Sequence, residues 1–288
     1  MNDRLTDVLV KMVDFGTTVH LLNYAFVQQA LLAAAILGLL AGALGPLIIS
    51  RQMSFAVHST SELSLTGASA ALLAGASVGL GAIAGSIVAA ILFGVLGAKA
   101  KERDSVIGVV LSFGLGLAVL FMWLYPGRTG TSFSLLIGQI VGVGTSGLQL
   151  LTACAIGVVA VLAVIYRPLL FASTDPEVAL ARGVPVRALS IIFAVLVGVA
   201  AALGVQIVGA LLVLSLLITP AAAAARVTSH PLWTTLLAVL FAETAAVGGI
   251  LLSLAPGVPV SSFVTAISFV IYLACRVVGR RQDRPAQV

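Results

Sequence analysis

The stretch SFAVHSTSELSLTGASAALLAGAS, residues 54–77, has the length of a membrane span and carries two ionisable side chains. His58 and Glu62 are four residues apart, so both lie on one face of a helix. Ser54 and Thr66 continue the same spacing on that face. An ionisable group inside the bilayer is costly, so two on one face indicate a functional site. Imidazole and carboxylate are also ligands for divalent metal ions, so the face predicts a metal site at His58 and Glu62.

The composition of the whole chain predicts a polytopic membrane protein. Of its 288 residues, 60% are hydrophobic and 9% are charged, and the mean hydropathy is +1.19. Soluble domains have about 25% charged residues. The formal net charge of +5 does not indicate nucleic-acid binding, because the basic residues fall in short segments between apolar runs. Cys154 and Cys275 fall within apolar runs and are expected to be small buried side chains.

Nine apolar stretches are long enough, at about 20 residues each, to cross a bilayer as helices. They are residues 24–49, 54–77, 79–98, 106–125, 147–166, 188–204, 206–225, 232–253 and 260–277. We therefore predict an all-α membrane protein with about nine spans, eight or ten being the alternatives, and a transmembrane domain at 24–277. A shorter apolar piece, Phe133 to Val143, is expected to be re-entrant or interfacial. Segments 1–23 and 278–288 are the predicted extracytoplasmic N-terminal segment and cytoplasmic polar tail.

The basic residues between the spans orient the predicted helices. With the N-terminus outside and the C-terminus inside, twelve Lys and Arg residues face the cytoplasm and three face outward. The inner set is Arg51, Lys99, Lys101, Arg103, Arg167, Arg182, Arg187, Arg226, Arg276, Arg280, Arg281 and Arg284, and the outer set is Arg4, Lys11 and Arg128. Cytoplasmic loops carry an excess of positive charge, so we predict this orientation.

Small residues at helical spacing predict close contacts between the spans. Three GxxxG pairs occur, at Gly38 and Gly42, Gly81 and Gly85, and Gly138 and Gly142. Such pairs let helix backbones approach each other in lipid, where no hydrophobic force drives helices together. We interpret all three as ordinary packing sites.

Motifs for catalysis are absent from the sequence. There is no GxxxxGK[ST] phosphate loop, and no CxxC, HExxH or GxSxG motif. The chain is therefore predicted to be no enzyme, and energy for any transport would come from a partner or from an ion gradient.

The most polar internal segment is FASTDPEVALARGVPVR, residues 171–187. Ser173 or Thr174 is expected to cap a short helix there, and Gly183 is expected to end it. Acidic residues of the first turn would be Asp175 and Glu177. A short capped helix on the cytoplasmic face is suited to docking another protein, and the alternative is a plain solvated loop.

Five stretches together resemble the permease subunits of the zinc/manganese/iron class of ABC importers. The resemblance covers roughly residues 25–277 and is most specific between 175 and 225. The stretches are DPEVALARGVPVRALSII from Asp175, VGALLVLSLLITPAAAAARV from Val208, RQMSFAVHSTSELSLTG from Arg51, DSVIGVVLSFGLGLAV from Asp104 and LLIGQIV from Leu135.

The resemblance implies a multi-subunit importer in a prokaryotic cell membrane. A second permease copy would complete the translocation path, two ATP-binding subunits would dock from the cytoplasm, and an extracytoplasmic protein would deliver the metal. The permease would have no cofactor of its own, since ATP is hydrolysed on the partner subunit. The residues that match the family's ATPase-docking segment are Asp175, Glu177, Ala181 and Gly183.

The chain departs from the family pattern in the second span. The family typically has an Asp, then a His four residues later, then a Pro-Gly pair. The corresponding residues here are His58, Glu62, Thr66 and Gly67. The acid and the imidazole are exchanged and the proline is missing, so a ligand pair is retained while the metal stays open between zinc and manganese, with iron as a third choice.

Several alternatives to a metal path remain open on the sequence. His58 and Glu62 can instead hydrogen-bond each other and hold helices together. A permease of the same architecture for an iron chelate or a cofactor would need no metal ligands in the membrane. A proton-coupled secondary transporter would use Glu62 or Glu243 and need no ATPase. A structural membrane protein would leave the polar face unexplained.

Overall fold

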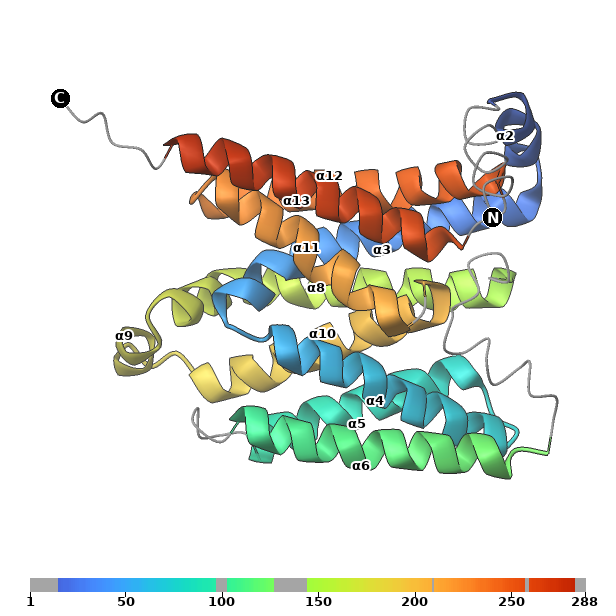
Figure 1. The fold of residues 1–288 in the computed structure, drawn as a ribbon. Helices are drawn as coiled ribbons and strands as arrows, with labels where there is room; N and C mark the ends of the chain where they lie inside the picture. Colours follow the sequence, from blue (N-terminus) through green and yellow to red (C-terminus); the bar gives the residue numbers. More distant parts are fainter. Residues whose placement is uncertain (1–14, 97–102, 127–143, 209, 257–258, 283–288) are drawn as a thin grey trace. The chain divides into compact units, whose positions relative to one another are not determined.

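The computed structural model describes residues 15–96, 103–126, 144–208, 210–256 and 259–282, and all regular structure in these ranges is helical (Figure 1). The helices of the N-terminal part are α2 (Phe15–Leu22), α3 (Ala25–Ser50), α4 (Ser54–Leu73), α5 (Val78–Leu96) and α6 (Arg103–Leu124). Then follow α8 (Thr145–Thr174), α9 (Pro176–Ala181), α10 (Val186–Val208), α11 (Ala210–Val227), α12 (Pro231–Leu254) and α13 (Val260–Gln282). The predicted all-α class is confirmed.

Each of the nine predicted spans corresponds to one helix of the structure. Among the described residues, six helices are long and apolar enough to cross a membrane, namely α3, α6, α8, α10, α12 and α13. Shorter apolar helices cover Val78–Phe93 within α5 and Val213–Val227 within α11. Nine membrane crossings therefore stay a prediction. The short piece at 133–143 and the Gly138/Gly142 pair lie outside the described residues.

The helices form two compact units. Unit 1 consists of Met1–Pro46, Ile140–Thr152 and Ser215–Val288, and unit 2 consists of Leu47–Gln139 and Ala153–Leu214. Helices α3, α8 and α11 contribute to both units. The permease domain expected at 24–277 stays a prediction, as do the two terminal segments.

In unit 1, a glycine face of α3 packs against α12. A Cβ added at Gly42 would lie 2.3 Å from the Cα of Val239, and one added at Gly38 would lie 3.0 Å from the carboxyl carbon of Glu243. The distance at Gly42 leaves no room for a larger residue and the distance at Gly38 is tight, so the packing role predicted for the Gly38/Gly42 pair is confirmed. The half-buried Glu243 side chain therefore lies directly against the backbone of α3.

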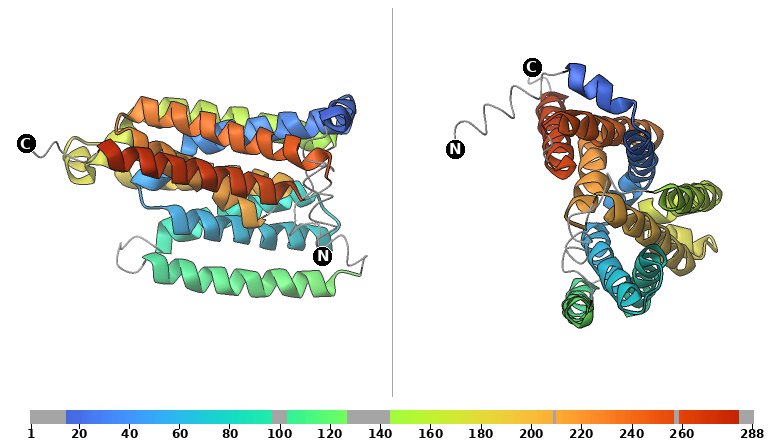
Figure 2. Two further views of the ribbon diagram at one scale, coloured as in Figure 1. Left: turned by 45° about the horizontal axis from the view of Figure 1, so that its top comes forward. Right: turned by 90° about the vertical axis from the view of Figure 1, so that its right-hand side faces the viewer.

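In unit 2, α4 packs against α5, α6 and α10, and Figure 2 shows α4, α5 and α6 running alongside one another. A Cβ added at Gly67 would lie 2.2 Å from the carbonyl oxygen of Gly81 and 2.8 Å from the Cα of Gly85. This contact confirms the packing role predicted for the Gly81/Gly85 pair. The backbone of α4, the helix that carries His58 and Glu62, is thus in direct contact with the backbone of α5.

Candidate functional site

His58 and Glu62 lie on one uninterrupted helix, α4, and both side chains are half-buried. The Nδ1 atom of His58 is buried and has no hydrogen-bond partner. Among the described residues, no hydrogen bond joins His58 to Glu62. The alternative in which the two side chains bond each other therefore finds no support in the geometry. A buried ring nitrogen without a hydrogen-bond partner needs an explanation, and a metal ion bound at this nitrogen would be such an explanation.

Thr66, the fourth member of the predicted polar face, serves a different purpose. Its Oγ1 donates a hydrogen bond to the carbonyl oxygen of Gly114 in α6, at 2.9 Å. A Cβ at Gly114 would lie 1.9 Å from Cδ2 of Leu63, so α6 also approaches α4 closely at this level. Thr66, which stands where the family has proline, is therefore a helix-packing residue, and the candidate ligands are His58 and Glu62.

Within the described ranges, the pair does not form a complete metal site by itself. In the part of the chain that the structure describes, no three His, Cys, Asp or Glu side chains gather closely enough to hold an ion. Structural zinc sites use four ligands, and manganese favours six. His58 and Glu62 can thus supply two ligands of a larger set, with the others coming from water or from another protein chain.

The polar segment after α8 forms the short helix α9, as the sequence predicts, but with a different cap. Asp175 is the N-cap, and its carboxylate accepts a hydrogen bond from the backbone N–H of Val178 at 3.0 Å. Ser173 and Thr174 were expected to cap the helix, and that expectation is wrong, because both belong to the last turn of α8. Pro176 then takes the first helical position, where its missing N–H costs nothing.

Gly183 ends α9 in the left-handed conformation, with φ +80°. Its N–H donates to the carbonyl oxygen of Leu180, and the N–H of Val184 donates to that of Ala179, both at 3.0 Å. This pair of bonds is the Schellman motif, which favours glycine at this position. Ala179 is fully buried and anchors the helix, while Val178 and Leu180 are 44% and 66% exposed. Helix α9 therefore presents apolar side chains beside the charges of Asp175 and Glu177.

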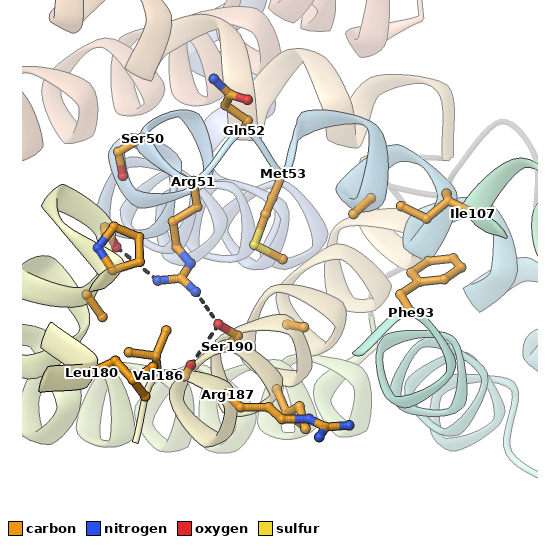
Figure 3. A pocket seen from close by; sticks show the side chains of 16 residues that line it. Ser50, Arg51, Gln52, Met53, Phe93, Ile107, Leu180, Val186, Arg187 and Ser190 are labelled. Atoms are coloured by element: carbon orange, nitrogen blue, oxygen red, sulfur yellow. Dashed lines mark hydrogen bonds between the residues drawn. The ribbon is translucent and has the colours of Figure 1, made fainter. Parts of the chain in front are cut away.

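A cavity of about 670 Å³ opens beside α9 within unit 2 (Figure 3). Arg51, half-buried in its wall, donates hydrogen bonds to the hydroxyl oxygens of Ser173 and Ser190. Its guanidinium carbon lies 5.8 Å from the centre of the Phe193 ring. Sequence reasoning treated Arg51 only as one inner-side charge. The sequence does show a lone arginine directly after a long apolar stretch. Its hydrogen-bond partners could not be predicted, because they are far away in the sequence.

Comparisons with known proteins agree with this arrangement. A sequence model described as the ABC 3 transport family matches residues 23–279. The manganese transport system membrane protein MntC of Halalkalibacterium halodurans is 31% identical over 238 residues, which cover 81% of this chain and 80% of that protein.

The manganese import system permease protein ScaB of Streptococcus parasanguinis is 29% identical over 264 residues, covering 91% of this chain and 94% of that one. Among solved structures, PsaBC from Streptococcus pneumoniae in complex with Fab superposes with a TM-score of 0.82 at 25% identity. It covers 92% of this chain and 99% of the other.

Proposed function

This chain belongs to the ABC 3 transport family and is a membrane permease subunit of an ABC metal importer, and we propose that its cargo is manganese. We propose further that His58 and Glu62 bind the ion on its way through the membrane. The observation that carries this proposal is the buried, unpartnered Nδ1 of His58 one helical turn from a carboxylate.

The chemistry of the pair suits a site that the ion passes through. The carboxylate supplies negative charge and a hard oxygen ligand, and the imidazole supplies a nitrogen. Two ligands from one chain bind an ion more weakly than a closed site does, and a transport path needs binding weak enough for release. A second copy of the chain across a twofold axis would add another His58 and Glu62, which gives four protein ligands with room for water.

Manganese is favoured over zinc by two independent considerations. Relatives that align with most of this chain are named manganese transport proteins. No cysteine or methionine accompanies His58 on its face of α4, so the soft sulfur ligands that favour copper and zinc are missing, and Glu62 adds a hard oxygen ligand that suits manganese. Zinc and iron are the competing ions in the test below.

We propose that α9 is the contact site for the ATP-binding subunit. The exposed Val178 and Leu180 beside Asp175 and Glu177 form a small apolar and acidic surface, which is the kind of exposed patch that marks a protein interface. The buried Ala179 and the left-handed Gly183 fix the shape of the helix before a partner binds. An extracytoplasmic metal-binding protein would supply the ion at the opposite side of the membrane.

The orientation that we propose places α9 in the cytoplasm. Arg51 and Arg187 line the same cavity as Leu180 of α9, so these arginines lie at one end of unit 2. Both belong to the predicted inner set, and their clustering supports placing this end of unit 2, with α9, in the cytoplasm. With nine spans, the N-terminus would then lie outside and the C-terminus in the cytoplasm. The protein would be a multi-pass protein of a prokaryotic cell membrane.

Uptake of labelled manganese and zinc by cells that express the permease with its partner subunits tests the ion path. His58→Ala and Glu62→Gln should each lower manganese uptake by roughly tenfold or more, since one ligand of the ion is lost in each variant. The amide keeps the size of Glu62 but loses the charge that offsets a divalent cation. His58→Asp should keep part of the uptake and shift the preference toward manganese, which favours oxygen ligands.

Glu243→Gln is the matched control, because it makes the same change at the other carboxylate within a predicted span. It should leave manganese uptake close to that of the wild type. Near-normal uptake of both ions by Glu62→Gln would refute the ion path. Loss of uptake in Glu243→Gln, with normal uptake in Glu62→Gln, would instead place the carboxylate that transport needs at Glu243.

A further inference from the structure

Arg51 joins three helices at one end of unit 2. It is the first residue after α3 and lies three residues before α4 begins at Ser54. Its Nη1 donates to the Oγ of Ser173 in α8 at 3.0 Å, and its Nη2 donates to the Oγ of Ser190 in α10. Figure 3 shows the guanidinium reaching across the cavity wall toward Ser190.

The hydroxyl oxygens of Ser173 and Ser190 are oriented to accept hydrogen bonds from Arg51. Ser173 Oγ donates its own hydrogen to the carbonyl oxygen of Leu169 at 2.6 Å, and Ser190 Oγ donates to that of Val186 at 2.9 Å. With the hydroxyl hydrogens committed within each helix, the oxygen lone pairs are left for Arg51. Hydrogen bonds from a charged donor are stronger than those between neutral groups, so the two contacts of Arg51 hold α8 and α10 more firmly than neutral hydrogen bonds would.

The backbone next to Arg51 is held in an uncommon conformation. Gln52 has φ +53°, which is unusual for a residue other than glycine. Its N–H donates to the carbonyl oxygen of Ile49 at 3.0 Å, and the N–H of Met53 donates to that of Ile48 at 2.9 Å. This Schellman arrangement ends α3 and fixes the direction in which Arg51 leaves the turn.

Ser173 and Ser190 flank α9 on its two sides. Ser173 lies three residues before α9, and Ser190 belongs to the second turn of α10, the helix after it. The same cavity is lined by apolar side chains of α4, α5 and α6, namely Ala56, Phe93 and Ile107, and of α8, α9 and α10, namely Ala172, Leu180 and Ala194. Arg51, in the wall of this cavity, links the end of α3 to α8 and α10 through hydrogen bonds from one side chain.

We infer that Arg51 is a positioning residue that makes the α9 segment and α4 move together. A push on α9 would shift Ser173 and Ser190, the hydroxyls would carry Arg51 with them, and Arg51 would move the start of the helix that holds His58. The inference rests on the proposed function, since it takes α9 as the ATPase contact and α4 as the metal-bearing helix.

Simultaneous measurement of ATP hydrolysis and manganese uptake by the complete importer in proteoliposomes tests this role. In Arg51→Gln the complex should assemble and hydrolyse ATP at a rate close to wild type, while the number of ions imported per ATP falls roughly tenfold, within the range of coupling between protein sites. The double variant Ser173→Ala with Ser190→Ala should show the same loss without any change of charge. Arg51→Lys, which keeps the charge but loses the forked geometry of the guanidinium, should be intermediate.

Arg187→Gln is the matched control, since Arg187 lines the same cavity and is exposed. It should leave both rates unchanged. A wild-type number of ions per ATP in Arg51→Gln and in the double serine variant would overturn the inference, as would a loss of hydrolysis in proportion to uptake. If the Arg51→Gln protein fails to accumulate, the number of ions per ATP in the double variant Ser173→Ala with Ser190→Ala tests the inference instead. A wild-type complex that imports no manganese would instead refute the proposed function, whatever the variants do.

Discussion

Replacement of Gly183 at the end of α9 isolates the contribution of one backbone conformation to docking. Gly183 has φ +80°, and no atom lies within 4 Å of a Cβ built there. Alanine at this position therefore meets no steric contact, and its whole effect is the strain of the left-handed conformation. That strain is about 1–2 kcal/mol for an L-residue.

A penalty of this size shifts the balance between the formed and the frayed end of α9 by roughly 5- to 30-fold. On the proposal that the ATP-binding subunit recognises α9 in its folded form, its affinity should fall by up to the same factor in Gly183→Ala, because the apparent affinity follows the fraction of α9 that is formed. Gly183→Asn should lose less, because asparagine tolerates the left-handed region better than alanine. Gly183→Pro should lose association altogether, because its φ is fixed near −65° and it cannot donate to Leu180.

Gly75 supplies the matched control. It ends α4 at φ +69° in the same motif. Its N–H donates to the carbonyl oxygen of Leu72, and the N–H of Ala76 donates to the carbonyl oxygen of Ala71. Here too nothing lies within 4 Å of a built Cβ. Gly75→Ala therefore carries a similar strain at a site remote from α9 in the sequence.

Titration of the purified ATP-binding subunit onto the detergent-solubilised permease measures the affinity directly. The expected order of affinity is wild type and Gly75→Ala, then Gly183→Asn, then Gly183→Ala, then Gly183→Pro. Equal affinity of Gly183→Ala and the wild type would refute the reasoning. An equal loss in Gly75→Ala would show that strain anywhere in the permease has this effect.

Two further predictions concern packing and orientation. Gly42→Ala should destabilise the permease by about 1–3 kcal/mol in a detergent melt, because the new Cβ would lie 2.3 Å from the Cα of Val239. Gly108→Ala, with nothing within 4 Å of its Cβ, should be neutral or slightly stabilising, and equal melts for the two variants would contradict the packing shown for α3 and α12. In a background without Cys154 and Cys275, cysteines at the exposed positions Ser105 and Thr174 should react only with a cytoplasmic reagent, and one at Ser77 only with an external reagent. Labelling of position 174 from outside would reverse the orientation and remove the proposed docking site from the cytoplasm.

The sequence predicted those features of the site that depend on local spacing. His58 and Glu62 share a face because four residues make about one turn of any α-helix. The end of α9 was predictable from Gly183, since glycine is favoured where φ must be positive. The cap of α9 was assigned to the wrong residue, because several residues in Ser173–Asp175 are good caps and only the end of α8 decides among them.

The sequence by itself determined that this chain is a set of apolar helices and which residues carry charge within and between them. In a membrane the backbone polar groups must be hydrogen-bonded within the protein, and the helix is the structure in which a long apolar run satisfies them by itself. Only the tertiary structure decided that Thr66 bonds α6 and that Arg51 bonds Ser173 and Ser190, which are 122 and 139 residues away along the chain. Such contacts depend on how helices pack side by side, and the pattern of a single helix does not contain the identity of its neighbours.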